Sequence, residues 1–203
     1  LLSNDTGVIN RTVTGEITIH NGEYTDPEGN TSYAFDDDDW VGFTFGYQDA
    51  DEDGSPNDYI GFTWSDGGGS PYSLESSYYA DGGYYLVDKD GETYDSDPRS
   101  DEVIDSNTGS SQEWQDNTTY SFSMTYTRDF VNVSIDGQKV LEASADDAGV
   151  DAFEPGRFGF TNASQGNVEF GNVRFANASS KDAPPEAADD LGYGIDLATE
   201  SRS

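Results

Sequence analysis

The acidic stretch at residues 49–58, DADEDGSPND, contains the residues best suited to chemistry. Its aspartates alternate along a loop, and Gly54 follows where the chain must turn sharply. This pattern brings hard oxygen ligands onto one centre, which suits Ca²⁺ with its roughly six to eight oxygens. The sequence therefore predicts a calcium site formed by Asp49, Asp51, Asp53, Asn57 and Asp58. A helical EF-hand would place a bidentate Glu where Ile60 stands, and a solvated acidic hairpin tip is the alternative.

A run of consecutive aspartates before an apolar strand pattern is a second candidate metal site. It consists of Asp36, Asp37, Asp38 and Asp39. Because neighbouring residues of a strand point to opposite faces, at most two of these could converge on one ion without a loop. A negatively charged entry to the strand is the competing interpretation.

Catalytic arrangements have little support. His20 is the one histidine, so a His-based triad and a multi-histidine metal site are excluded. Laminarinase-like jelly-roll enzymes carry E-x-D-x-E on one strand, whereas the nearest string here, Glu102 to Asp105, lacks the final acid. A carboxylate pair for glycoside hydrolysis stays open, since acids are everywhere. We expect a domain that is not an enzyme.

Several tyrosines could stack on sugar rings. They are Tyr72, Tyr78, Tyr79, Tyr84 and Tyr85. Because tyrosine is the commonest aromatic residue throughout the chain, core packing or loop anchoring is the favoured interpretation for them.

Alternation with a period of two predicts strands. The clearest runs from Tyr120 to Thr127, and an apolar row through residues 131–135 follows it. Asp136-Gly137 then supplies a two-residue turn in which both residues take positive φ, and residues 138–143 return.

Other strands follow the same pattern. Apolar residues at 41, 43, 45 and 47 predict one strand face, and its partner runs through residues 59–64. Ile17 and Ile19 precede Asn21-Gly22, which predicts a hairpin turn. Residues 157–161 and 167–175 are expected to form a final pair, with a bulge at Gly171.

Regularly spaced strands with polar turns predict an all-β fold, a two-sheet antiparallel jelly-roll sandwich of the concanavalin or laminin-G type. We expect residues 65–116 to form long loops with one or two short strands, one of them around Tyr84 to Val87. The jelly-roll domain is expected to span residues 1–175. Residues 176–203, rich in Ala, Pro and acids, are expected to form a linker or docking tail.

Composition limits the environment and the partners. Lys and Arg number 9 against 41 Asp and Glu, and the formal net charge is −32. Such a surface suits multimolar salt, where the Debye length falls to about 3 Å or less and repulsion is muted. This favours a halophilic protein over an acidic calcium-buffering protein from ordinary seawater. Nucleic acid is excluded as a partner because no basic face can form. No apolar run is long enough to span a membrane, and cysteine is absent.

Asn-x-Ser/Thr sequons indicate export to an extracellular compartment or the cell surface. They occur more often than the roughly two expected by chance. We predict surface glycosylation at Asn4, Asn10, Asn30, Asn117, Asn132, Asn162 and Asn177.

The stretch DDDDWVGFTFGYQ followed by YIGFTW resembles the thrombospondin C-terminal domain. That family carries an acidic run, then G-F-x-F-G-Y-Q, a hairpin and a Trp-ended strand. Residues 114–175, with GRFGF and NVRF, are also similar. The resemblance implies a concanavalin-like jelly roll with bound calcium and an extracellular adhesive role. The family's acidic run corresponds to Asp36–Asp39, and residues 49–58 resemble a thrombospondin type 3 calcium motif.

The combined interpretation is a secreted, glycosylated, calcium-binding domain of a halophilic archaeon. It would act in cell-surface adhesion or as a subunit of an extracellular filament, with glycans or surface proteins as partners. The alternative is a carbohydrate-binding module of a larger secreted polysaccharide-degrading enzyme, and third comes a hydrolase or lyase. Residues 1–14 could pair as an edge strand, either in their own sheet or donated to another subunit of a homo-oligomer.

Overall fold

The computed structural model of the chain describes residues 7–20, 23–25, 31–33, 40–48, 57–65, 82–92, 102–163 and 168–178. Its strands are β1 (Arg11–Ile19), β2 (Glu23–Thr25), β3 (Thr31–Tyr33), β4 (Trp40–Gln48), β5 (Asn57–Ser65), β6 (Gly83–Glu92), β7 (Glu102–Thr108), β8 (Thr118–Tyr126), β9 (Phe130–Ile135), β10 (Gln138–Ser144), β11 (Arg157–Ala163) and β12 (Val168–Asn177). A short 3₁₀ helix, η2 (Ser110–Gln112), precedes β8. Within the described ranges no helix has the length and hydropathy needed to cross a membrane.

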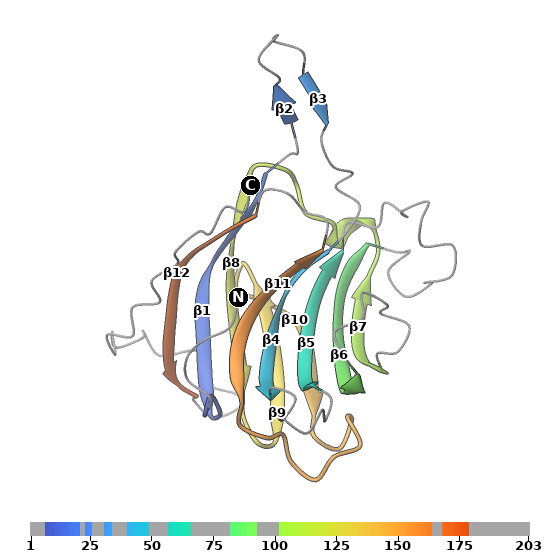
Figure 1. Cartoon of the computed structure of the whole chain (residues 1–203), viewed down its shortest axis with the longest axis vertical. Coiled ribbons are helices and arrows are strands. Elements are labelled where there is room, and N and C mark those ends of the chain that lie inside the picture. Colours follow the sequence, from blue (N-terminus) through green and yellow to red (C-terminus); the bar gives the residue numbers. More distant parts are fainter. Residues whose placement is uncertain are drawn as a thin grey trace.

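Two five-stranded antiparallel sheets face one another (Figure 1). The front sheet, nearer the viewer in Figure 1, has the order β11-β4-β5-β6-β7. The back sheet has the order β10-β9-β8-β1-β12, and β2 pairs with β3 apart from both. This arrangement confirms the predicted all-β, two-sheet antiparallel sandwich.

The core lies between the two sheets and is largely aromatic. Phe43 of β4 contacts Phe62 of β5, Phe158 of β11 and Phe122 of β8, with ring centroids 5.3, 6.3 and 4.7 Å away. These rings come from alternate positions of strands in both sheets, as the period-two pattern predicts. The front sheet therefore has one face fixed to the core and the other facing outward.

The turn at Asp136-Gly137 is confirmed. Asp136 has φ 49° and Gly137 has φ 74°, the left-handed values of a type I′ hairpin turn between β9 and β10. Asp136 also binds the neighbouring strand, because its Oδ1 accepts the Ser121 amide at 2.8 Å and its own amide donates to the Ser121 carbonyl at 2.8 Å. The turn is thus bonded to β8 as well as closing its own hairpin.

The prediction that Tyr47 shares a face with Phe43 and Phe45 is wrong, because β4 contains a bulge. The pairing of β4 with β5 shifts register between Phe45 and Gln48, and Gly46 within that step has φ 63°. The extra residue turns Tyr47 away from the core, where its ring contacts that of Tyr59 with centroids 5.8 Å apart.

The predicted pair of final strands is also wrong, because the two strands belong to opposite sheets. β11 pairs with β4, whereas β12 pairs with β1. Their aromatic rings meet across the interior: Phe160 stacks on Phe170 with centroids 4.3 Å apart. The bulge expected at Gly171 is present, since the register with β1 shifts between Thr14 and Glu16, opposite Gly171 to Arg174.

The hairpin predicted at Asn21-Gly22 does not form with β1, whose partners are β8 and β12. Residues 21 and 22 themselves lie outside the described residues. β1 is therefore an inner strand of the back sheet and not an edge strand. Of the two possibilities for residues 1–14, residues 11–14 pair within their own sheet, whereas residues 1–6 lie outside the described residues.

Residues 65–116 contain two strands, β6 and β7, which agrees with the expected number, but with 10 and 7 residues they are longer than the short strands expected. The edge formed by β7 contacts the β10 edge of the back sheet through side chains. The Glu142 amide donates to Asp105 Oδ2 at 3.0 Å, and Asn107 Nδ2 donates to the Val140 carbonyl at 3.5 Å. At the other end of the chain, β12 runs to Asn177, two residues beyond the expected domain end at residue 175.

Candidate functional site

The predicted calcium ligands fall mostly outside the described residues. Asp49, Asp51, Asp53 and the run Asp36–Asp39 lie there, while Asn57 and Asp58 begin β5. Among the described residues no group of three or more His, Asp or Glu side chains could hold a metal ion. The calcium prediction therefore stays a prediction.

The described sequons lie away from the outer face of the front sheet. Asn10, Asn117, Asn162 and Asn177 are exposed, and Asn132 is half-buried on the outer face of the back sheet. Asn4 and Asn30 lie outside the described residues. Glycans at the described sequons would therefore not be attached to the outer face of the front sheet.

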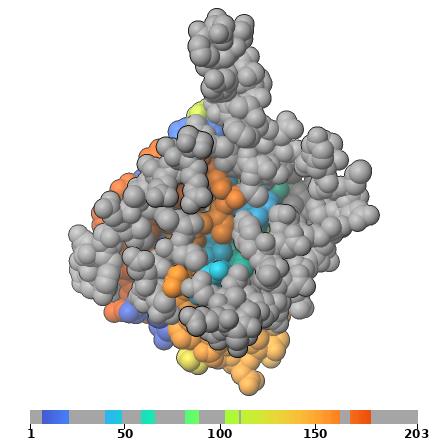
Figure 2. Space-filling view, in the orientation of Figure 1, coloured from blue at the N-terminus to red at the C-terminus, as the bar shows by residue number. Residues whose placement is uncertain are grey.

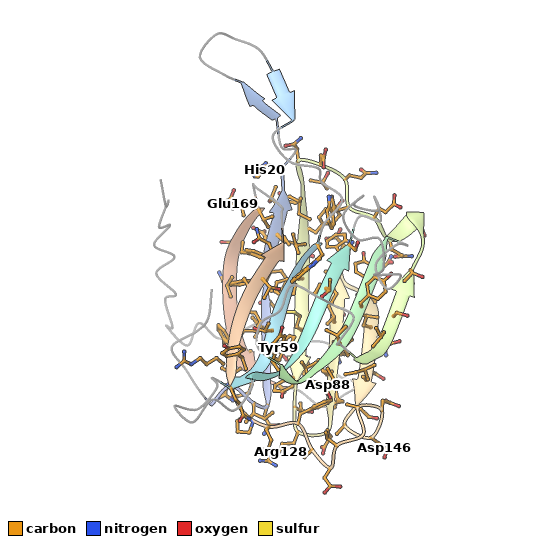
Figure 3. The ribbon with its side chains drawn as sticks, turned by 45° about the vertical axis from the view of Figure 1, so that its right-hand side comes forward. His20, Tyr59, Asp88, Arg128, Asp146 and Glu169 are labelled. Atoms are coloured by element: carbon orange, nitrogen blue, oxygen red, sulfur yellow. The ribbon has the colours of Figure 1, made fainter. Side chains whose placement is uncertain are left out.

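The residues considered for catalysis have structural contacts. His20 lies at the surface, with Nε2 3.8 Å from Glu169 Oε2 and Nδ1 3.4 Å from Asn117 Oδ1. Figure 3 shows this pair at the end of the sandwich opposite Tyr59 and Asp88. Asp105 accepts backbone amides with both oxygens, from Ser106 at 2.8 Å and from Glu142.

The centre of the outer face of the front sheet consists of glycines and threonines. On β4, residues 40, 42 and 44 alternate with the buried Val41 and Phe43, so they face outward. Register then places Thr44 beside Gly61 and Gly159, and Gly42 beside Thr63 and Thr161. We call the set Gly42, Thr44, Gly61, Thr63, Gly159 and Thr161 the glycine floor.

Close packing requires glycine at position 42 and leaves little room for a side chain at position 61. A Cβ on Gly42 would collide with the Phe62 carbonyl oxygen, and one on Gly61 would lie 3.0 Å from the Val87 side chain. At these positions no side chain projects from the backbone of the sheet. Figure 2 shows atoms of β11, β4 and β5 at the centre of this face.

Thr44 supplies an unsatisfied polar atom on the glycine floor. Its residue is 3% exposed, and within the described part of the structure its hydroxyl has no hydrogen-bond partner. Leaving a buried hydroxyl unpaired costs about 1–3 kcal/mol.

Aromatic residues lie at both ends of the glycine floor. Trp40 is half-buried at one end of β4, and the Tyr47–Tyr59 pair is half-buried at the other. The Tyr59 ring lies within 3.5 Å of the place a Gly61 Cβ would occupy, so it extends along the floor. Seven residues of strand separate the two ends, roughly 23 Å.

Sequence reasoning did not find this face. Of the tyrosines it considered, Tyr84 is 6% exposed and packs on Trp64 with centroids 5.2 Å apart, so it belongs to the core. Tyr85 is on the outer face but buried, and Tyr72, Tyr78 and Tyr79 lie outside the described residues. The missed signal was Gly46, because a glycine inside a strand pattern indicates a bulge that moves the next residue to the other face.

Solved structures share this fold, although neither a scan of family models nor a search of curated proteins found a match. The carbohydrate binding module CBM66 from Bacillus subtilis is similar over 86% of this chain and 78% of its own, with 16% identity and a TM-score of 0.51. A Bacillus subtilis protein of unknown function with a galectin-like fold is similar over 87% and 76%, with 11% identity and a TM-score of 0.55. These likenesses show the fold alone, which is a jelly-roll sandwich of the galectin-like type.

Proposed function

We propose that this domain binds glycans on the outer face of its front sheet and is not an enzyme. The observation that carries the proposal is the glycine floor, with Trp40 at one end and the Tyr47–Tyr59 pair at the other. The C–H faces of sugar rings pack on aromatic rings, and sugar hydroxyls bond to Thr and Ser side chains. The similarity to a structure named as a carbohydrate binding module supports the same class of ligand.

The biological setting that fits this activity is a secreted, glycosylated, calcium-binding surface domain. Residues 49–56 connect β4 to β5 directly after Tyr47 and Gln48. A Ca²⁺ bound by this connection would neutralise its carboxylates and fix the end of the floor that carries the tyrosine pair. Cell-surface adhesion is the role we favour, and a carbohydrate-binding module of a larger secreted enzyme is the alternative.

The direct test compares binding to an array of immobilised glycans by three forms of the domain in high salt and calcium. Tyr59→Ala removes one ring of the outer face and should weaken binding by about fivefold or more, since stacking contributes on the order of 1 kcal/mol or more per ring. Phe130→Ala is the matched control, because Phe130 is a half-buried aromatic residue at the start of β9 in the back sheet. Equal binding by all three forms, or no binding to any glycan, would contradict the proposal.

A further inference from the structure

Basic residues are scarce in this chain, and two of them flank the tyrosine pair of the outer face. Lys and Arg total 9 of 203 residues. Arg157, the first residue of β11, pairs in register with Tyr47, and Lys89 of β6 pairs with Tyr59. One row across four neighbouring strands therefore contains Arg157, Tyr47, Tyr59 and Lys89 in that order.

Arg157 belongs to the outer face. The next residue, Phe158, is 1% exposed and packs in the core, so the alternation of the strand directs Arg157 outward. It is half-buried. A guanidinium presents five N–H donors in a planar fork, so it can bind both oxygens of a carboxylate or sulfate alongside its other contacts.

Three basic residues of other elements contact acceptors outside the front sheet. Arg11 donates to Asn177 Oδ1 at 2.8 Å, Arg128 lies 3.5 Å from Glu154, and Lys139 lies 3.1 Å from Glu142. These contacts belong to the back sheet and its connections. Among the described strands of the front sheet, Arg157 and Lys89 are the basic residues, and they fall in one row.

Building on the proposed function, we infer that the glycan is anionic, with a carboxylate or sulfate group held by Arg157 while its ring lies on the tyrosine pair. A neutral sugar needs no cation beside its stacking surface. An anionic polymer approaching a chain of net charge −32 needs a local positive group to bind at all. Multimolar salt screens long-range repulsion, whereas an ion pair at contact distance with the half-buried Arg157 is screened less.

The test uses short galacturonate oligosaccharides, which are too short to gel with calcium, and their methyl esters, which carry no charge. A sulfated galactose oligosaccharide forms a third arm and separates sulfate from carboxylate recognition. Calorimetric titration in fixed high salt should show the wild-type domain binding one of the two anionic probes at least about tenfold more tightly than the neutral ester. Arg157→Gln should abolish this preference without weakening ester binding, and Arg157→Lys should retain part of it.

Arg174→Gln is the matched control, because Arg174 is an exposed arginine of β12 in the back sheet. It should leave the preference unchanged. Equal binding of all three probes by the wild type, or a preference that survives Arg157→Gln, would overturn the inference. If the neutral ester still loses affinity on Tyr59→Ala, the proposed glycan-binding function stands and the anionic specificity alone fails. If no probe binds and the glycan array is also blank, the proposed function fails with it.

Discussion

At the scale of single residues, side chains on the two faces of the front sheet have opposite roles. Tyr84 and Tyr59 lie on neighbouring strands, yet Tyr84 packs against Trp64 in the core while Tyr59 contacts Tyr47 on the outer face. Both are tyrosines in apolar–polar alternation, so their types alone could not distinguish the two roles. Because successive side chains of a strand point to opposite faces, the face of each tyrosine depends on which of its neighbours in the strand enter the core.

The hydroxyl of Tyr84 makes the core sensitive to alkaline pH. Burial, together with Tyr120 and the charge of Asp136, raises the pKa of Tyr84 from 10.0 to about 12. Because the unfolded chain loses this proton near its ordinary pKa, the free energy of unfolding should hold up to about pH 10 and fall from about pH 10 to about pH 12. Urea unfolding across this range should show a shallower fall for Tyr84→Phe, and an equal fall in both proteins would refute this origin.

At the scale of elements, the sequence predicted single strands and tight turns more readily than it predicted which strands pair with one another. The alternation in residues 120–127 and the Asp136-Gly137 pair are local signals, and β8, β9 and β10 form as expected. The pairing of β1 with β8 and β12, and the separation of β11 from β12 into two sheets, depend on which aromatic rings meet in the core. Such contacts join residues far apart in the sequence, so no pattern at a fixed spacing predicts them.

The bulge of β4 is the element that moves Tyr47 to the outer face, and it depends on Gly46. A Cβ there would collide with the Tyr126 hydroxyl and lie 3.0 Å from the Glu154 carbonyl oxygen, at a φ of 63°. Gly46→Ala should therefore lower the free energy of unfolding by about 2–4 kcal/mol, from backbone strain plus the clash.

Gly149→Ala is the matched control for that substitution. Gly149 has φ 72°, but no atom lies within 4 Å of its added Cβ. This variant should lose only about 1 kcal/mol. Equal losses in denaturant unfolding of the two variants would contradict a crowded bulge at Gly46.

At the scale of the whole molecule, charge sets the conditions under which the sandwich is stable. The described ion pairs are largely exposed, for example Arg128–Glu154 with side chains 52% and 59% exposed, so each contributes little. The 41 acidic residues have few basic partners. Dilution to low ionic strength should unmask their repulsion and expand or unfold the chain, whereas native near-ultraviolet circular dichroism at about 50 mM salt would argue against a halophilic surface.

Calcium is proposed to stabilise the connection between β4 and β5. At roughly a hundredfold excess over its dissociation constant, an ion bound only by the folded state adds about 2.7 kcal/mol. Chelation at fixed high salt should therefore lower the melting temperature. Asp51→Ala removes a proposed ligand and should destabilise the protein in calcium but leave it unchanged in chelator. Equal destabilisation in both conditions would rule out a role in binding the ion.

The central claim is that glycans bind on the outer face of the front sheet. The most direct measurement is an NMR titration of the isotope-labelled domain, in high salt and calcium, with a glycan found to bind on the array. The account predicts that amide shifts concentrate at Tyr47, Tyr59, Gly61 and Thr44. Shifts concentrated instead on Thr14, Ser123 and Ser134 of the back sheet, or no shifts at a saturating concentration, would contradict it.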